Sequence, residues 1–197
     1  MIKITDLDFG YENNPVFNNL NLTIDNKVMA VCAPSGSGKT TLLRLIMGIE
    51  KPQSGKIEFL SGGKLFDPRF SAVFQEDRLI EQITVMQNFL PVLKSNSKKE
   101  SMLKTNNICK MLHINDLTER MPSQLSGGQK RRVAIARALI ADYDILVLDE
   151  PFNGLDEDIK QITAKTIKAN VGKRHILLVS HNEGDIRLLN AERILLG

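Results

Sequence analysis

Hydrophobic and polar residues alternate in the first part of the chain. Residues 20–24 read Leu-Asn-Leu-Thr-Ile, and this period of two predicts a β-strand with one buried face. A similar alternation covers residues 2–9, with a shift of one residue at Thr5-Asp6. A single extra residue in a strand is typical of a β-bulge, so we expect a bulge there.

Three later runs are apolar without alternation, residues 28–32, 145–148 and 176–179, and residues 70–74 are a fourth, weaker candidate. A strand that is apolar on every position is covered on both faces, as in a parallel sheet between helices. From about residue 80 to 141 the strand pattern stops, and residues 83–92, 101–112 and 127–141 predict helices. We therefore expect one α/β core interrupted by a helical subdomain.

Composition agrees with a globular domain. The 197 residues are 42% hydrophobic and 25% charged, which excludes wholesale disorder and fibrous repeats. The net charge of +3 neither favours nor excludes an anionic partner. No apolar run is long enough to span a bilayer, and residues 1–6 lack the apolar core of a secretory signal. Two cysteines, Cys32 and Cys109, form no disulfide framework, which favours a reducing cytosol.

Each of the four apolar runs is followed by residues that can bind a ligand or take part in catalysis. The run at 28–32 leads into a Gly/Ser-rich loop, and the others end at Gln75, at Asp149-Glu150 and at Ser180-His181. Ligands of open parallel sheets bind beyond the carboxyl ends of the strands. The sequence therefore predicts one site at this edge.

The loop after residue 32 has the composition of a phosphate-binding loop. It reads Ala33, Pro34, Ser35, Gly36, Ser37, Gly38, Lys39, Thr40, and a helix is expected from Thr41 to Met47. Small residues let backbone N–H groups approach phosphate oxygens, the lysine reaches the β- and γ-phosphates, and the threonine hydroxyl holds Mg²⁺. The alternative is a plain turn between a strand and a helix. Alanine stands where the usual motif has glycine, and we expect Ala33 to end the strand with a negative φ.

The acidic pair and its neighbours suit a metal and water site. An Asp at a strand end can position Mg²⁺, which we expect of Asp149, and Glu150 can polarise the attacking water as general base. Gln75 can contact both the metal and that water, and His181 lies at the same expected edge. The alternatives are a polar turn for the acidic pair and a structural role for the histidine.

A second helix start also has features of an anion site. Ser126 is a natural N-cap for the helix expected over residues 127–141, and Gly127, Gly128 and Gln129 form its first turn. Glycines disfavour helix, and the cations at Lys130, Arg131 and Arg132 have the wrong sign for the positive end of a helix dipole. These costs favour an anion-binding end over an ordinary capped helix. One nucleotide could then lie between two copies of the chain.

In their order, these motifs resemble the ATP-binding cassette (ABC) ATPases. Leu125-Ser126-Gly127-Gly128-Gln129 is similar to their signature, and it stands between the phosphate loop with Gln75 and the acidic pair with His181. The resemblance covers nearly the whole chain. It implies a phosphate-loop NTPase core with a mostly parallel sheet, an N-terminal antiparallel β region and an inserted helical subdomain. It also implies a single domain over 1–197, with the core at about 1–79 and 142–197 and the subdomain at about 80–141.

The resemblance implies ATP and Mg²⁺, with two subunits enclosing two ATP molecules head to tail as a homodimer or a pair of ATPase subunits. Thr40, Gln75 and Asp149 are then the metal ligands, Glu150, His181 and Gln75 the catalytic residues, and Tyr11 stacks on adenine. Asp156 contacts the partner subunit. Two departures from the family pattern are Asn153-Gly154, where Ser-Ala is more usual, and Asn182, where Asp is frequent.

The spacing between Gln75 and Ser126 distinguishes transporter ATPases from other branches of the family. Gln75 and Ser126 are too close for the long inserted coiled coils of DNA-repair relatives, so the chain resembles a separate transporter ATPase. The resemblance then implies an integral-membrane permease partner that docks near residues 75–93, a place on the cytoplasmic face of the membrane, and no nucleic acid. Residues 74–79 with Thr84-Val85 look like importer ATPases for nitrate, sulfonate and taurine. The alternative is a soluble ABC regulator or nucleic-acid-associated ATPase, whereas a phosphate-loop kinase leaves the Ser126 helix end unexplained.

Overall fold

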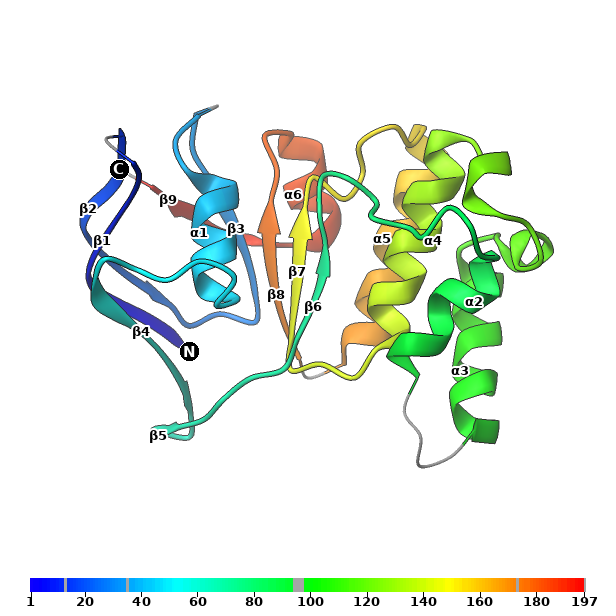
Figure 1. Ribbon diagram of the computed structural model, residues 1–197, viewed down its shortest axis with the longest axis horizontal. Coiled ribbons are helices and arrows are strands. Elements are labelled where there is room, and N and C mark those ends of the chain that lie inside the picture. Colours follow the sequence, from blue (N-terminus) through cyan, green and yellow to red (C-terminus); the bar gives the residue numbers. More distant parts are fainter. Residues whose placement is uncertain (13, 35, 94–97, 173, 197) are drawn as a thin grey trace.

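The computed structural model describes residues 1–12, 14–34, 36–93, 98–172 and 174–196. Two sheets and several helices follow one another along this chain (Figure 1). The strands are β1 (Ile2–Tyr11), β2 (Asn14–Ile24), β3 (Val28–Cys32), β4 (Ser54–Ser61), β5 (Lys64–Leu65), β6 (Phe70–Val73), β7 (Ile145–Asp149), β8 (His175–Val179) and β9 (Glu192–Leu195). The α-helices are α1 (Lys39–Ile46), α2 (Val85–Phe89), α3 (Lys98–Met111), α4 (Gly127–Ile140), α5 (Glu157–Val171) and α6 (Glu183–Leu189). Short 3-10 turns are η1 (Leu90–Val92), η2 (Asn115–Leu117) and η3 (Pro122–Gln124).

The first sheet is antiparallel, in the order β2-β1-β4-β5. The predicted strands at 2–9 and 20–24 are confirmed as β1 and β2, with Ile4 opposite Leu22. The bulge is confirmed as well, because the register shifts after Ile4 and Asp6 has a φ of 49°. The side chain of Asn21 accepts a hydrogen bond from the backbone N–H of Asp6 at 3.0 Å, which replaces the interrupted ladder bond.

The second sheet is parallel, in the order β6-β7-β8-β3-β9. All four apolar runs are confirmed as strands in it, and β9 adds an edge strand that the pattern did not predict. Alternate side chains enter two different cores. Val31, Val147 and Leu177 pack with β1, β2 and α1, whereas Ala30, Leu148 and Leu178 pack with α4 and α5. The nearly continuous apolar sequence of these strands follows from that double cover.

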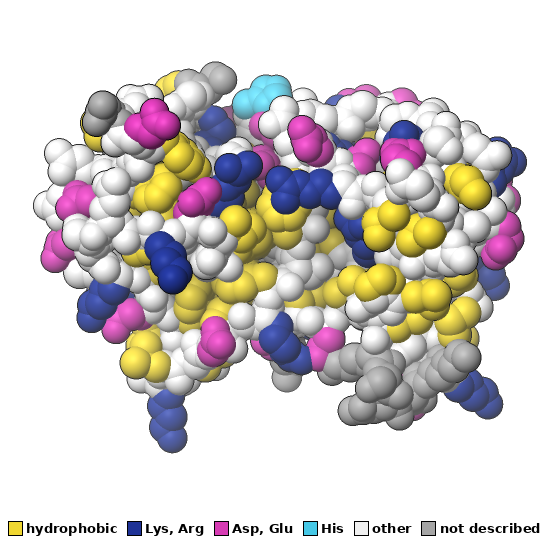
Figure 2. Space-filling model, in the orientation of Figure 1, with side chains coloured by type: hydrophobic (Ala, Val, Ile, Leu, Met, Phe, Trp, Pro, Cys, Tyr) yellow, Lys and Arg dark blue, Asp and Glu magenta, His cyan; other side chains and the backbone are white. Residues whose placement is uncertain are grey.

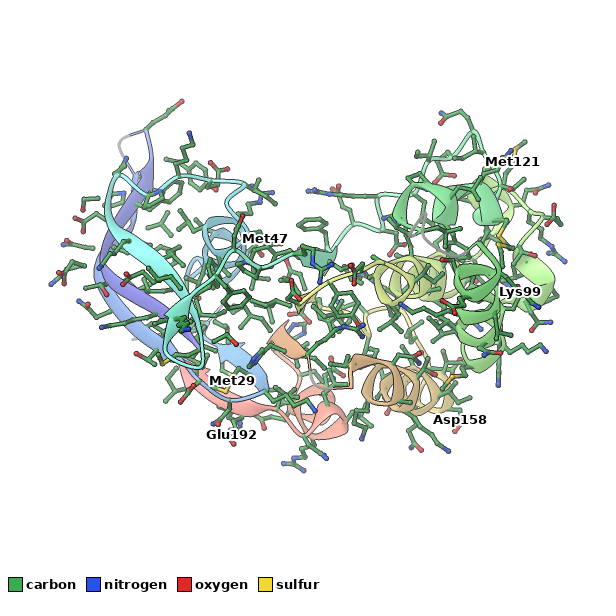
Figure 3. All side chains as sticks on the ribbon, turned by 90° about the horizontal axis from the view of Figure 1, so that it is seen from below. Met29, Met47, Lys99, Met121, Asp158 and Glu192 are labelled. Carbon is green, nitrogen blue, oxygen red and sulfur yellow. The ribbon has the colours of Figure 1, made fainter. Side chains whose placement is uncertain are left out.

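Helix α1 lies between the two sheets, α6 lies next to the parallel sheet, and α2 to α5 lie at the other end of the molecule (Figure 1). Figure 3 shows the antiparallel sheet curving around α1, which ends at the labelled Met47, with the helices near Met121 and Lys99 far from it. Met29 of β3 and Glu192 of β9 are register partners and lie close together in that view. This arrangement places the start of α1 at the carboxyl edge of the parallel sheet.

The helices predicted within residues 83–141 are found, although the first is split. Helix α2 ends at Phe89 and continues as the 3-10 turn η1, which contains Pro91. Proline lacks the N–H that a continuing α-helix needs, so the turn tightens there. The helices α5 and α6 and the strands β4 and β5 were not anticipated. The division into a core and a subdomain at about residues 80 and 141 stays a prediction, and one hydrophobic cluster joins α2, α3 and α4 to β7 and α5. Over the described residues, no helix is long and apolar enough to cross a membrane.

Candidate functional site

A cavity of about 550 Å³ opens at the carboxyl edge of the parallel sheet, at the upper edge of Figure 1. It collects residues that lie far apart in the sequence, from β1, the loop before α1, the ends of β6, β7 and β8, and the turn after β7. Its lining consists of Tyr11, Val16, Gly36, Gly38, Lys39, Thr40, Thr41, Gln75, Asp149, Glu150, Asn153, Val179 and His181. The edge predicted from the four apolar runs is therefore one concave site.

The start of α1 faces this cavity without an internal cap. Gly38 is the N-cap residue with a φ of 87°, and no side chain accepts from the first turn. The first N–H groups of a helix have no partner within the helix, so an anion can bind them. A Cβ at Gly38 would lie 2.6 Å from Val16 Cγ1 and 2.9 Å from Phe17 Cζ. Both the conformation and the packing thus require glycine here.

The rest of the loop is arranged around the lysine. Lys39 Nζ donates to the carbonyl oxygens of Ala33 and Pro34, each at 2.8 Å. Ala33 is not among the residues with positive φ, so it ends the strand at little conformational cost, as expected. The Ser37 hydroxyl is buried and has no hydrogen-bond partner among the residues that the structure describes, as in a loop that receives a polar ligand. Ser35 lies outside the described residues.

Thr40 and Asp149 bring two oxygen atoms together in the cavity. The Thr40 hydroxyl donates to Asp149 Oδ2 at 3.0 Å. Burial raises the pKa of the Asp149 carboxyl, and the Thr40 hydrogen bond acts in the opposite direction. Among the described residues, no group of three or more His, Cys, Asp or Glu side chains could hold a metal ion. A site with so few protein oxygens fits Mg²⁺, which keeps several waters and takes its other ligands from phosphate.

Glu150 occupies an uncommon backbone conformation directly after β7. Its φ is 49°, a region that residues other than glycine seldom adopt, and only 8% of the residue is exposed. Oε1 lies 2.7 Å from the ring Nδ1 of His181 and also accepts the backbone N–H of His181 at 3.1 Å. The imidazole is 71% exposed, so it can turn toward a ligand in the cavity. Glu150 and His181 are thus in direct contact.

The loop that carries Gln75 is hydrogen-bonded to helix α4, at a residue 56 positions later in the sequence. Arg131 of α4 is buried, and it donates to the carbonyl oxygens of Phe74 at 2.6 Å and Gln75 at 2.7 Å. One turn and a half further, Arg137 donates to the carbonyl oxygens of Asp77 and Arg78. The loop that carries Gln75 is therefore fastened to α4 through its backbone. The sequence reasoning did not anticipate these contacts, because only the partners reveal which arginines are internal.

The same contacts correct the explanation of the basic residues in α4. Lys130 pairs with Glu81 at 3.0 Å, and Arg132 donates to the carbonyl oxygens of Leu112 and His113, both at 2.8 Å. Together with Arg131, these cations have acceptors within the chain, so the expectation that they serve an anion at the helix end is not supported. They fasten α4 to its neighbours.

The N-terminus of α4 is capped by side chains of its own first turn. Ser126 Oγ accepts from the backbone N–H of Gln129, and Gln129 Oε1 accepts from that of Ser126, which together form a capping box. The predicted N-cap is thus confirmed. Ser126 and Gly127 are exposed, whereas a Cβ at Gly128 would lie 3.1 Å from the carbonyl oxygen of Gly154. Within one chain, none of residues 126–129 lines the cavity.

Of the remaining predicted residues, Tyr11 lines the cavity and Asp156 does not. Tyr11 is 41% exposed and packs edge-on against Phe9 at a centroid distance of 5.0 Å. Asp156 accepts the backbone N–H of Ile159 and caps α5. Val16 and Asn153 line the cavity although the motifs did not place them there. Nothing in the local pattern distinguishes Val16, which reaches the site through the hairpin of β1 and β2.

A model of the ABC transporter family matches residues 17–153, most of the chain. The chain belongs to this family. It is therefore the ATP-binding and ATP-hydrolysing subunit of an ABC transporter. Over 196 residues it is 37% identical to the thiamine import ATP-binding protein ThiQ of Shigella sonnei, a match that covers 94% of the chain and 83% of that protein. The corresponding protein of Escherichia coli K12 is 36% identical over the same shares.

Solved structures agree over the full length of the chain. The ATP-binding cassette MJ0796, in a dimeric post-hydrolysis state with ADP and phosphate, superimposes with a TM-score of 0.83 at 27% identity and is covered to 94%. The ATP-binding subunit of another ABC transporter has a TM-score of 0.86 at 21% identity, with 85% of that chain covered, and supports the fold. The predicted α/β fold with an antiparallel and a parallel sheet is thus confirmed.

Proposed function

We propose that this chain is the ATPase subunit of an importer and that two copies enclose two ATP·Mg²⁺ between them. The observation that carries the proposal is the uncapped start of α1 in the same cavity as the Thr40–Asp149 pair and Glu150. The α1 end and Lys39 bind the phosphates, Tyr11 stacks on adenine, and Thr40 and Asp149, with Gln75, hold Mg²⁺. When bound, Mg²⁺ neutralises charge on the phosphates. Glu150 is the general base, and His181 orients it.

The second copy supplies what one chain lacks. Residues 126–129 do not line the cavity, and Ser126 and Gly127 at the helix start are exposed. We propose that they approach the nucleotide bound by the partner, as the dimeric state of the MJ0796 cassette suggests. The chain then works as a homodimer or with a paired ATPase subunit.

A membrane permease is the second partner. Ile80 and Leu90 are 49% and 54% exposed, near the Gln75 loop, and apolar side chains at such a surface favour a protein contact. On the face drawn in Figure 2, hydrophobic side chains are also visible in a hollow between the two ends of the molecule. The chain is then peripheral on the cytoplasmic face of the membrane. Recovery with membranes only when a permease is co-expressed supports this partner, whereas full recovery as a soluble protein favours the regulatory alternative.

Thiamine is the transported substrate that the relatives suggest. Both relatives named above are thiamine import proteins, and their identity extends over almost the whole chain. The resemblance of residues 74–79 to nitrate, sulfonate and taurine importers rests on a few positions and is the second possibility. Since we expect other chains to contact the substrate, uptake of labelled thiamine against taurine in cells with and without this chain decides between them.

The test of the shared site is Glu150→Gln, which keeps the size of the side chain but removes its basicity. We expect hydrolysis to fall by about 10²-fold or more, the scale for a positioned general base. Binding survives because Lys39 and the Thr40–Asp149 pair remain, so ATP with Mg²⁺ converts the variant to a stable dimer and ADP does not. Size-exclusion chromatography and phosphate release measure both effects.

A matched control is Glu119→Gln, since Glu119 is exposed and distant from the cavity lining. It should hydrolyse ATP like the unchanged chain. A Glu150→Gln protein that binds ATP yet stays monomeric at millimolar concentrations removes the case for a shared site. Hydrolysis at the normal rate removes the case for Glu150 as base.

A further inference from the structure

Behind Glu150, a buried hydroxyl lies between two carboxylates. Ser180 Oγ is 3.2 Å from Glu150 Oε2 and 2.9 Å from Asp185 Oδ2. Ser180 and Asp185 are each only 2% exposed, so neither contact is shared with solvent. The family motifs name Glu150 and His181 but give no role to Asp185, which belongs to α6.

A count of hydrogens restricts the protonation of this group. A serine hydroxyl has one hydrogen to donate and two lone pairs that accept. The backbone N–H of Asn182 donates to Ser180 Oγ at 3.1 Å and fills one lone pair. A full two-centre hydrogen bond to each carboxylate requires that Ser180 donates to one of them and that the other, protonated, donates to Ser180.

The surroundings identify Asp185 as the protonated partner. Glu150 Oε1 already accepts the backbone N–H of His181, whereas the Asp185 carboxyl has Ser180 as its hydrogen-bond partner among the described residues. The charges of α5 that face it are Lys160 and Glu157, which pair with each other at 2.8 Å. Burial raises the pKa of Asp185, and the hydrogen bond with Ser180 and the charge of Lys160 oppose this rise.

We propose that Ser180 and Asp185 are positioning residues for ATP hydrolysis, with a neutral Asp185 donating to Ser180 and Ser180 donating to Glu150. The proposal rests on the proposed role of Glu150 as base. The two oxygens of Glu150 are then held differently. His181 holds Oε1 and is exposed enough to leave it, while the buried pair keeps Oε2 in place when His181 moves.

The experiment compares Ser180→Ala, Asp185→Ala and Asp185→Asn in steady-state ATP hydrolysis and in nucleotide binding. We expect both alanine variants to lower kcat by about 10-fold to 10²-fold, the scale for a misplaced catalytic group, with the KM for ATP nearly unchanged. Asparagine keeps an N–H donor at the same reach, so Asp185→Asn should recover most of the lost kcat. Asp67→Ala, at an exposed aspartate far from the cavity lining, is the matched control and should keep its rate.

A double-mutant comparison separates positioning from general damage. If Asp185 acts through Glu150, then adding Asp185→Ala to Glu150→Gln lowers the residual single-turnover rate no further. An additive loss overturns the proposal, and so does an unchanged kcat in both alanine variants. An Asp185→Asn rate as low as that of Asp185→Ala shows an ionised Asp185 and overturns it too. If Glu150→Gln alone hydrolyses normally, the role of Glu150 fails first, which is a distinct outcome. Thermal melting checks that each variant folds, and Ser180→Ala carries the test if Asp185→Ala does not.

Discussion

The two glycine-rich helix starts of this chain are similar in sequence and opposite in structure. Helix α1 begins after Gly36-Ser37-Gly38 and has no side-chain cap, whereas Ser126 and Gln129 cap α4 reciprocally. A capping box satisfies two backbone donors and stabilises the helix, while an uncapped end leaves them to a ligand. The α1 end is therefore ready for phosphate within one chain, and the α4 end is complete without one.

Their cations differ in the same way. Lys39 lies within its own loop, on the carbonyl oxygens of Ala33 and Pro34, and lines the cavity. The arginines of α4 bond instead to carbonyl oxygens of the Gln75 loop and of the α3 end. A charge near a helix start in the sequence thus says little about an anion site until the partners of that charge are known. The sequence shows that a charged residue is close to a helix start, but only the fold shows which groups that charge contacts.

The largest effect is expected at the α1 end. Lys39→Ala removes the charge that reaches the phosphates, and we expect ATP hydrolysis to fall by at least about 10²-fold, the scale for losing one donor to developing charge. ATP affinity should fall as well. Phosphate release and equilibrium nucleotide binding measure the two effects.

Lys130→Ala is the matched change at the α4 end, since that lysine pairs with Glu81 at 3.0 Å outside the cavity. The contrast predicts hydrolysis within about twofold of normal, because partly exposed ion pairs contribute little. Equal losses at both lysines would remove the distinction between the two helix ends.

The next effect concerns the α4 end and a second copy. Ser126→Arg places a long cation where we propose that the partner's nucleotide approaches, so hydrolysis should fall by at least about 10-fold through lost alignment. ATP binding to the single chain should persist, because residues 126–129 do not line its cavity. Ser126→Ala is the control: it removes the capping hydroxyl, at a cost of about 1 kcal/mol of stability, but adds no bulk where the partner's nucleotide would approach. A Ser126→Arg protein with unchanged turnover would make Ser126 a helix cap only.

The contrast also shows what the sequence can and cannot supply. Buried strands, the phosphate loop and the N-cap at Ser126 were predictable, because each depends on residues adjacent in the chain. The fastening of Gln75 by Arg131 was not, since those residues are joined across 56 positions. The packing of Val16 against Gly38 and the contact of Ser180 and Asp185 with Glu150 were not predictable for the same reason. Strands such as β4 and β9 were missed because their partly exposed positions carry little periodicity.

The smallest effects test the glycines themselves with one substitution at two places. Gly38→Ala forces a Cβ into a φ of 87° and to within 2.6 Å of Val16 Cγ1. We expect it to destabilise the fold by about 1–3 kcal/mol, the usual cost of such strain. An added Cβ at Gly127 would have no atom of the described residues within 4 Å, and Gly127 has no positive φ. There, alanine is the better helix former, so Gly127→Ala should stabilise the fold by up to about 1 kcal/mol.

Chemical denaturation of both variants measures their free energies of unfolding, and ATP hydrolysis assays measure their activity. Because Gly38 borders the cavity and Gly127 borders only solvent in the single chain, Gly38→Ala should lose ATP binding and Gly127→Ala should keep it. A loss of turnover in Gly127→Ala with binding intact would place another molecule close to that open side of α4, as the shared site requires. Normal turnover there, together with normal turnover in Ser126→Arg, would leave the α1 end as the one phosphate site of the working protein.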